Sequence, residues 1–201
     1  MANVALKFGP ADHGRRLAWD EFDGADYVAG FNYEIIAGRL YVSPQPNPPE
    51  HILERWLRRA VERYSDARPE VINFVAVKGR VFLSAATRPT VPEPDLAAYR
   101  AFPLDLPYDD IHWEDVSPVL VAEVLVDGSI EKDLGRNPPL YLRVPTIQEY
   151  WVLDGSISPD RPSLIRHRRR RKSWAVDTIA YGDTLTSDVL PGFALLIDPR
   201  Q

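Results

Sequence analysis

The chain has 201 residues, of which 45% are hydrophobic and 26% charged, and its formal net charge is −5. This length and composition suit a globular domain with a sizeable core. The absence of cysteine excludes disulfides, zinc–thiolate sites, cysteine nucleophiles and iron–sulfur clusters. Any metal must be held by oxygen or imidazole ligands, which favours Mg²⁺ or Mn²⁺ over zinc.

Residues 1–16 lack the basic-then-apolar order of a signal peptide, and we expect them to be poorly ordered. No apolar run approaches the roughly 18 residues that cross a bilayer. The sequence therefore predicts a cytoplasmic protein without membrane contact. Residues 17–201 are expected to form a single domain.

The first half of the chain alternates helical and strand patterns. Apolar residues recur at helical spacing over 17–28, which predicts a short helix. Alternation over 33–43, around an Ala-Gly pair, predicts a β-hairpin. The proline-rich segment 43–49 predicts no regular structure. The clearest helix is predicted over 50–64, with an apolar stripe of Ile52, Leu53, Trp56, Leu57, Ala60 and Val61.

The next segments predict strands. Residues 71–77 and 80–84 are expected to form two strands that turn at Lys78-Gly79, and residues 95–99 a short strand. The segment 119–126 (VLVAEVLV) is almost wholly apolar, as is typical of a strand covered on both faces.

The last third predicts a helix and further strands. Residues 129–143 are expected to be helical, with Asn137 as a possible cap and Pro138 at the first helical position. Residues 149–153 predict an apolar strand, and residues 163–198 predict strands with turns. The order of elements predicts an α/β (mixed α+β) fold, in which helices pack on a mixed sheet.

Two carboxylates are the main candidates for a functional site. Glu123 is the one charged residue of VLVAEVLV, and a buried charge pairs, neutralises or binds a metal. Alternatively, Glu123 faces a solvated edge or pairs with an arginine. Asp95 follows Pro94 at a strand start, where an aspartate is also common as turn chemistry. Because adjacent strands lie about 4.8 Å apart, the two carboxylates could share one hard cation.

Several segments in order resemble the Uma2 (DUF820) family of the PD-(D/E)XK nuclease superfamily. They are YEIIAGRLYVSPQPNPPEH, PEPDLAAY, SPVLVAEVL, PPLYLRV, IQEYWVLDG and DTLTSDVLPGFALLID. The resemblance covers most of residues 17–198. It implies a restriction-endonuclease-like central mixed sheet flanked by helices, with additional antiparallel hairpins. It also implies a Mg²⁺- or Mn²⁺-dependent nuclease that acts on DNA.

The resemblance assigns roles to individual residues. Asp95 and Glu123 match the acidic residues of the superfamily motif and are implied to be metal ligands. Glu34 matches a hairpin glutamate that lies near the site, although it could simply be an exposed hairpin charge. His51 matches a histidine that follows the proline-rich turn, where an imidazole often only caps or packs against a helix. His51 is therefore the weakest catalytic candidate.

The chain departs from the family at the basic residue. Leu125 stands where the superfamily motif has lysine, and Asn137 stands where the family places lysine on the following helix, four residues after Asp133. Asparagine cannot supply positive charge to a phosphate. Arg136 is a possible substitute. Lys132 directly precedes Asp133. Because it lies five residues before Asn137, we expect the two side chains to point to different faces of the helix.

A basic run, RHRRRRK, occupies residues 166–172. It could grip a phosphate backbone, and the candidate contacts are Arg168, Arg169, Arg170, Arg171 and Lys172. The alternative is a solvated hairpin, in which consecutive side chains alternate between faces.

Three functions follow from these patterns. The leading one is a Mg²⁺-dependent endonuclease that hydrolyses DNA phosphodiester bonds. The second, favoured by Asn137, is a catalytically weak or inactive nuclease-fold protein that binds DNA or a protein partner. The third is an interaction protein without a metal. Strand edges and the Trp- and Tyr-rich segments could also support a homodimer.

Overall fold

The computed structural model describes residues 6–83, 87–127 and 130–201. The chain forms two compact units, a smaller one of Met1–Pro46 with Phe82–Glu93 and a larger one of Asn47–Val81 with Pro94–Gln201. Our expectation that residues 17–201 form a single domain stays a prediction. None of the described helices is long and apolar enough to cross a membrane.

The smaller unit consists of a hairpin, a two-stranded sheet and a short helix. The hairpin strands β3 (Phe31–Ile36) and β4 (Arg39–Pro44) pair antiparallel. Ala37 and Gly38 both have positive φ, 52° and 69°, which matches the twist of a two-residue hairpin turn and confirms the predicted hairpin. The helix α1 (Trp19–Asp23) is shorter than predicted.

Residues 6–16 are not the irregular tail that we expected. The strand β1 (Lys7–Phe8) pairs in parallel with β2 (Asp26–Tyr27), and Phe8 is buried. Hydrophobic burial holds this segment in place. The core of the smaller unit comprises Phe8, Leu17, Phe22, Tyr33, Ile35, Leu40 and Val91.

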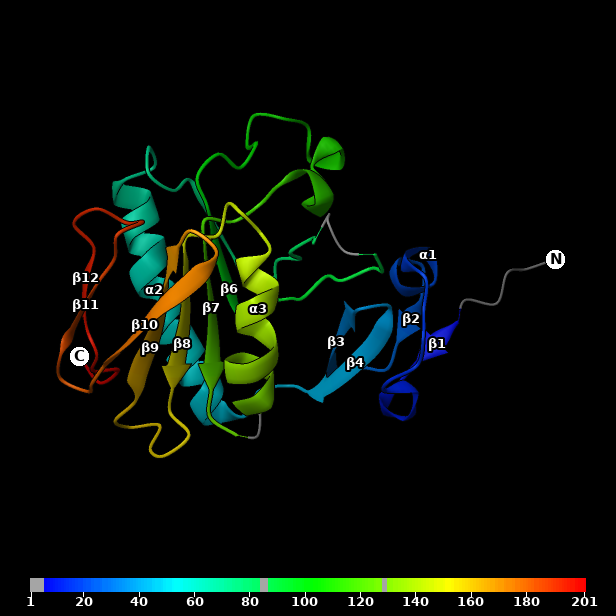
Figure 1. Ribbon diagram of the computed structural model, residues 1–201, viewed down its shortest axis with the longest axis horizontal. Coiled ribbons are helices and arrows are strands. Elements are labelled where there is room, and N and C mark those ends of the chain that lie inside the picture. Colours follow the sequence, from blue (N-terminus) through cyan, green and yellow to red (C-terminus); the bar gives the residue numbers. More distant parts are fainter. Residues whose placement is uncertain (1–5, 84–86, 128–129) are drawn as a thin grey trace. The chain divides into compact units, whose positions relative to one another are not determined.

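The larger unit has a six-stranded mixed sheet in the order β10-β9-β8-β7-β6-β5 (Figure 1). Its strands are β5 (Phe74–Ala76), β6 (Leu96–Tyr99), β7 (Leu120–Leu125), β8 (Glu149–Asp154), β9 (Ser163–Arg170) and β10 (Ser173–Ile179). Within this sheet β7 and β8 pair in parallel, and the other neighbouring strands pair antiparallel. A small additional sheet pairs β11 (Thr184–Thr186) with β12 (Ala194–Leu196).

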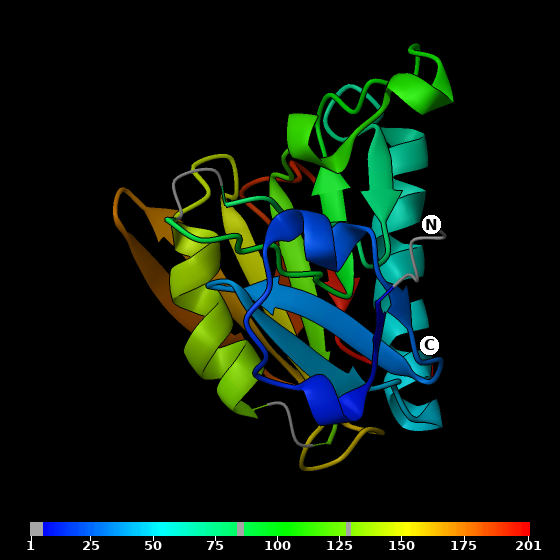
Figure 2. The same cartoon turned by 90° about the vertical axis from the view of Figure 1, so that its right-hand side faces the viewer.

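Helices cover both faces of this sheet (Figure 2). The helix α2 (Pro48–Ala67) packs its Leu53, Leu57 and Val61 against the face that carries Leu96 and Ala122. The short helix α3 (Asn137–Leu142) lies on the other face, where Glu123 points. Because neighbouring residues of a strand face opposite ways, the apolar strand β7 can bury hydrophobic side chains on one face and a carboxylate on the other.

Two predicted segments are wrong in detail. Residues 80–83 do not form a strand, although β5 forms and the chain does turn at Lys78, which has a positive φ of 54°. Residues 43–49 are partly regular, because β4 extends to Pro44 and α2 begins at Pro48. Asn47 accepts a hydrogen bond from the backbone N–H of Glu50 and so caps α2.

Candidate functional site

Asp95 directly precedes β6, and Glu123 lies in the neighbouring strand β7. The antiparallel register pairs Leu96 with Ala122, so the next positions outward are Asp95 and Glu123. If the register continues by one residue, the two side chains lie on the same face of the sheet, opposite to Leu96 and Ala122. Both residues are buried, with 5% and 0% of their surfaces exposed. The alternative of a solvated edge is therefore wrong for Glu123.

Asp95 is held by a backbone N–H and a lysine. Its Oδ2 accepts a hydrogen bond of 2.7 Å from the backbone N–H of Val124, and its Oδ1 pairs with the Nζ of Lys78. Burial pushes the pKa of Asp95 upward, but the charges of Lys78 and Lys132 outweigh burial and hold this pKa below its ordinary value. Asp95 is thus an ionised carboxylate near neutral pH.

Lys78 reaches Asp95 because of its backbone position. Its N–H donates to the carbonyl of Pro94 over 3.1 Å, and its left-handed φ marks the turn that follows β5. A non-glycine residue in this region costs free energy and persists when its surroundings hold it there. The charges of both Asp95 and Glu123 act on the Lys78 ammonium and raise its pKa against the opposing effect of burial. We did not predict Lys78 from the sequence.

Glu123 is held by three donors from one helical segment. Its Oε1 accepts hydrogen bonds from Asn137 Nδ2 at 2.8 Å and from the Tyr141 hydroxyl at 2.9 Å, while Lys132 Nζ lies 3.5 Å from Oε2. Asn137 and Tyr141 are fully buried, so their rotamers are fixed by packing. The carboxylate of Glu123 is therefore oriented by side chains of the segment that follows β7.

Our prediction that Lys132 and Asn137 face different sides of a helix is wrong. Residues Glu131–Arg136 form a π-helix, and the backbone N–H of Asn137 bonds to the carbonyl of Lys132, five residues earlier. This wider turn places both side chains against Glu123. Asn137 is also not a cap, because it continues the helix with αR backbone angles.

Two glutamates of α2, Glu50 and Glu54, interact electrostatically with this cluster of charged residues. Burial raises the pKa values of Glu50 and Glu54, and the negative charge of Asp95 raises both further. They occupy positions i and i+4 beside the apolar stripe of α2, and this spacing was the sequence signal that could have identified them. Glu50 and Glu54, which we did not predict, therefore interact electrostatically with Asp95.

The remaining predicted residues have other contacts. The Nε of Arg136 donates to Asn137 Oδ1 over 3.0 Å, which orients that amide. His51 has a largely exposed side chain and lies 3.5 Å from Glu54. Glu34 belongs to the smaller unit, where it is buried and accepts a hydrogen bond from the backbone N–H of Glu93. It is not an exposed hairpin charge, and its place near Asp95 and Glu123 stays a prediction.

Several arginines of the basic run form hydrogen bonds or ion pairs within the protein. Arg169 donates to the carbonyls of Tyr141, Leu142, Val144 and Ile147 at the end of α3. Arg168 pairs with Asp177 and Asp188, and Arg170 pairs with Asp188.

The run forms strand β9 up to Arg170 and turns at Arg171, as the hairpin alternative predicted. Arg171 and Lys172 lie at this turn with exposed side chains. The phosphate-binding prediction thus rests mainly on Arg170, Arg171 and Lys172.

The donor set of the cluster fits a hard divalent cation. Among the described residues no group of three or more His, Cys, Asp or Glu side chains is arranged to hold a metal. Mg²⁺, however, keeps several waters and is bound by only one or two carboxylates in many sites. Asp95 and Glu123 could act as those two carboxylates, although the ammonium groups of Lys78 and Lys132 already contact them.

Comparisons with known proteins agree with this architecture. A sequence model of the Uma2 family, described as "Putative restriction endonuclease", matches residues 19–198. No curated protein matches the chain. Among solved structures, the chain is similar to a crystal structure described as a putative nuclease belonging to DUF820 from Anabaena variabilis. The TM-score is 0.68 and the identity 14%, covering 90% of this chain and 95% of that chain. Because the family match spans nearly the whole sequence, the chain belongs to the Uma2 family.

Proposed function

We propose that this protein is a divalent-metal-dependent nuclease that hydrolyses phosphodiester bonds of DNA. The observation that carries the proposal is the pair of buried carboxylates, Asp95 directly before β6 and Glu123 in the neighbouring strand β7. Asp95 and Glu123 would hold Mg²⁺ or Mn²⁺. A bound cation of this kind lowers the pKa of water and offsets the charge that develops on a phosphate.

The residues around the pair have separate tasks in this proposal. Asn137 and Tyr141 fix the orientation of Glu123 through its Oε1. The backbone N–H of Val124 does the same for Asp95 through its Oδ2. A pre-oriented carboxylate loses little conformational entropy when it binds a ligand, and this favours binding.

Lys78 and Lys132 supply the positive charge that Asn137 cannot. Both ammonium groups contact the acidic pair, and their charges stabilise the negative charge of a phosphate more strongly in a partly buried site than in water. In the sequence, Asn137 at the position of the family lysine favoured the second alternative, a weak or inactive enzyme. The two lysines in the cluster favour an active one.

Cleavage of plasmid DNA tests this function. Purified protein should nick or linearise supercoiled plasmid in the presence of Mg²⁺ or Mn²⁺ and should be inactive with excess chelator. Asp95→Asn keeps the shape of the side chain and removes its charge, so cleavage should fall by at least about a hundredfold, or roughly 2.7 kcal/mol of barrier. Equal cleavage by the wild type and Asp95→Asn would show that the activity arises elsewhere.

A further inference from the structure

The exposed face of α2 carries a line of arginines that lies outside the carboxylate cluster. Arg55, Arg59 and Arg63 follow one another at intervals of four residues, and all three side chains are exposed. Like charges at this spacing destabilise a helix by a few tenths of a kcal/mol per pair. Among the described residues no carboxylate forms an ion pair with any of the three, whereas their neighbour Arg58 pairs with Glu62. We call these three residues the arginine stripe.

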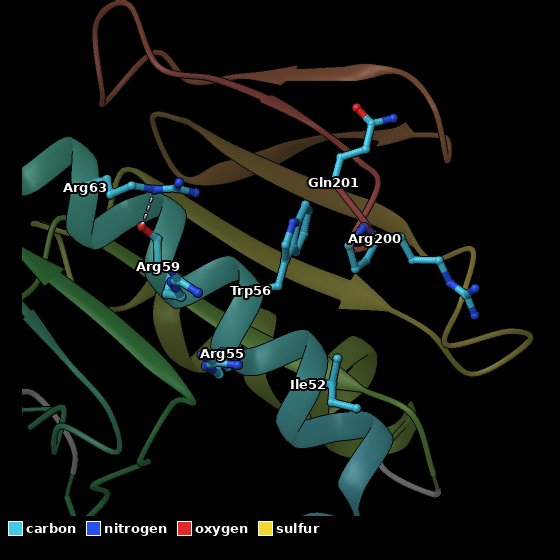
Figure 3. Close-up of a pocket in the computed structure, with 8 residues that line it drawn as sticks. Ile52, Arg55, Trp56, Arg59, Arg63, Arg200 and Gln201 are labelled. Atoms are coloured by element: carbon cyan, nitrogen blue, oxygen red, sulfur yellow. Dashed lines mark hydrogen bonds between the residues drawn. The ribbon is translucent and has the colours of Figure 1, made fainter.

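The stripe borders a hollow of about 280 Å³ between α2 and the last residues of the chain (Figure 3). Trp56 and Ile52 of α2 and the segment 199–201 complete the lining. Ile52 is 61% exposed. The Nε of Arg63 donates to the carbonyl of Arg59. The protein as a whole has a net charge of −5. The positive charge around this hollow is therefore a local feature of the surface.

From this arrangement we infer that the arginine stripe binds the sugar–phosphate backbone of duplex DNA. The inference rests on the proposed function, in which DNA is the substrate. Eight residues of helix span about 12 Å. Duplex DNA carries one negative charge per roughly 1.7 Å of its axis, so the length of duplex beside the stripe carries about seven phosphates, divided between its two strands. Guanidinium groups bind phosphate oxygens in a bidentate manner.

The arginine stripe lies on a different side of α2 from the side that faces the carboxylate cluster of Asp95 and Glu123. Glu54 faces the cluster, whereas Arg59, five residues later, lies about 140° further round the helix. The stripe therefore adds DNA affinity that depends neither on a divalent cation nor on Asp95. Contacts with the sugar–phosphate backbone do not distinguish between bases. The affinity that the stripe contributes should therefore not depend on the DNA sequence and should fall as the salt concentration rises.

Salt-dependent DNA binding tests the stripe. The probe is a fluorescently labelled 20-base-pair duplex, and its anisotropy is measured with chelator present over about 50–200 mM salt. The test variant is Arg55→Gln/Arg59→Gln/Arg63→Gln. The matched control, Arg16→Gln/Arg88→Gln/Arg161→Gln, removes the same charge from scattered exposed positions. Circular dichroism and thermal unfolding establish that both variants fold.

The test variant should lose at least about tenfold in affinity at low salt, and the slope of log K against log salt should become shallower by two to three, at roughly 0.9 per lost contact. The control should keep both the wild-type affinity and the wild-type slope. A wild-type slope in the test variant would overturn the inference, and so would an equal loss in the control. Competition by polyglutamate as strong as that by unlabelled duplex would assign the stripe to acidic proteins instead.

Failure of this inference and failure of the proposed function are distinguishable. Binding is measured without a divalent cation, so it is independent of cleavage. If the stripe binds DNA but Asp95→Asn cleaves like the wild type, only the proposed site is wrong. If Asp95→Asn abolishes cleavage but the stripe variant binds normally, only the stripe is wrong.

Discussion

The position of Lys78 affects both metal binding and phosphate chemistry at the proposed site. It donates a backbone hydrogen bond to Pro94 and places its ammonium against Asp95 Oδ1, while Val124 occupies Oδ2. A divalent cation bound through Oδ1 must therefore share that oxygen with Lys78 or displace it. The same ammonium that supports chemistry at a phosphate should thus weaken metal binding.

Lys78→Met should bind Mn²⁺ more tightly and cleave DNA more slowly. Removal of a positive charge beside Asp95 should lower the Kd for Mn²⁺ about tenfold, or roughly 1.4 kcal/mol. Calorimetric titration measures the affinity, and plasmid cleavage at saturating Mn²⁺ measures the activity. Lys7→Met, at an exposed position of β1, is the control and should change neither quantity. Weaker Mn²⁺ binding by Lys78→Met would contradict this role.

The sequence identified the two acidic residues but not their basic partners. Glu123 was predictable because a lone charge in an apolar strand must be compensated, and Asp95 because it directly precedes the neighbouring strand β6. Lys78 was not, because its contact depends on a left-handed turn and on the pairing of β5 with β6. Lys132 was assigned to the wrong face because regular α-helical spacing was assumed where a π-helix forms.

At the scale of single elements, the end of α3 depends on Arg169. Its guanidinium donates to four backbone carbonyls at and beyond the last turn, where a helix runs out of intrahelical donors. It also lies over the ring of Trp174 at 5.0 Å. Arg169 thus connects the hairpin of β9 and β10 to the helix that carries Asn137 and Tyr141.

Arg169→Met should destabilise the protein by roughly 1–3 kcal/mol, because it removes a donor from several carbonyls while keeping the aliphatic bulk. Urea unfolding measures this change. Arg171→Met removes the same charge from the exposed turn and should stay within about 0.5 kcal/mol of the wild type. Equal stability of the two variants would show that Arg169 does not support α3.

The ion pair of Arg166 with Asp177 makes the β9–β10 hairpin sensitive to acid. The hydrogen bonds from Arg166 lower the pKa of Asp177 below its ordinary value. Because the folded-state pKa is lower than the unfolded one, the pair stabilises the protein above the unfolded pKa, and this contribution is lost as the pH falls through the folded pKa.

Asp177→Asn should therefore lower the free energy of unfolding at pH 7, by about 1 kcal/mol since Asp177 is partly exposed, and have less effect at strongly acidic pH. Urea unfolding at several pH values measures the difference between variant and wild type. A difference that stays constant down to strongly acidic pH would rule out the ion pair as its cause.

At the scale of the whole molecule, the order of elements predicted the sheet because hydrophobic periodicity encodes burial. The strands at 95–99, 119–126 and 149–153 form as β6, β7 and β8, and the long helix forms as α2. The division into two units was not predictable, because it depends on packing between residues far apart in sequence. A neighbour with 14% identity has the same fold, so the pattern of burial matters more than the individual residues.

Calorimetric titration of the whole protein with Mn²⁺ tests the central claim most directly, namely that Asp95 and Glu123 hold one divalent cation. The wild type should bind Mn²⁺ at one site, and a saturating concentration about 100 times the Kd should stabilise it by roughly 2.7 kcal/mol. Asp95→Asn and Glu123→Gln, each shown by circular dichroism to be folded, should both lose this binding and this stabilisation. Wild-type affinity for Mn²⁺ in both variants would contradict the account.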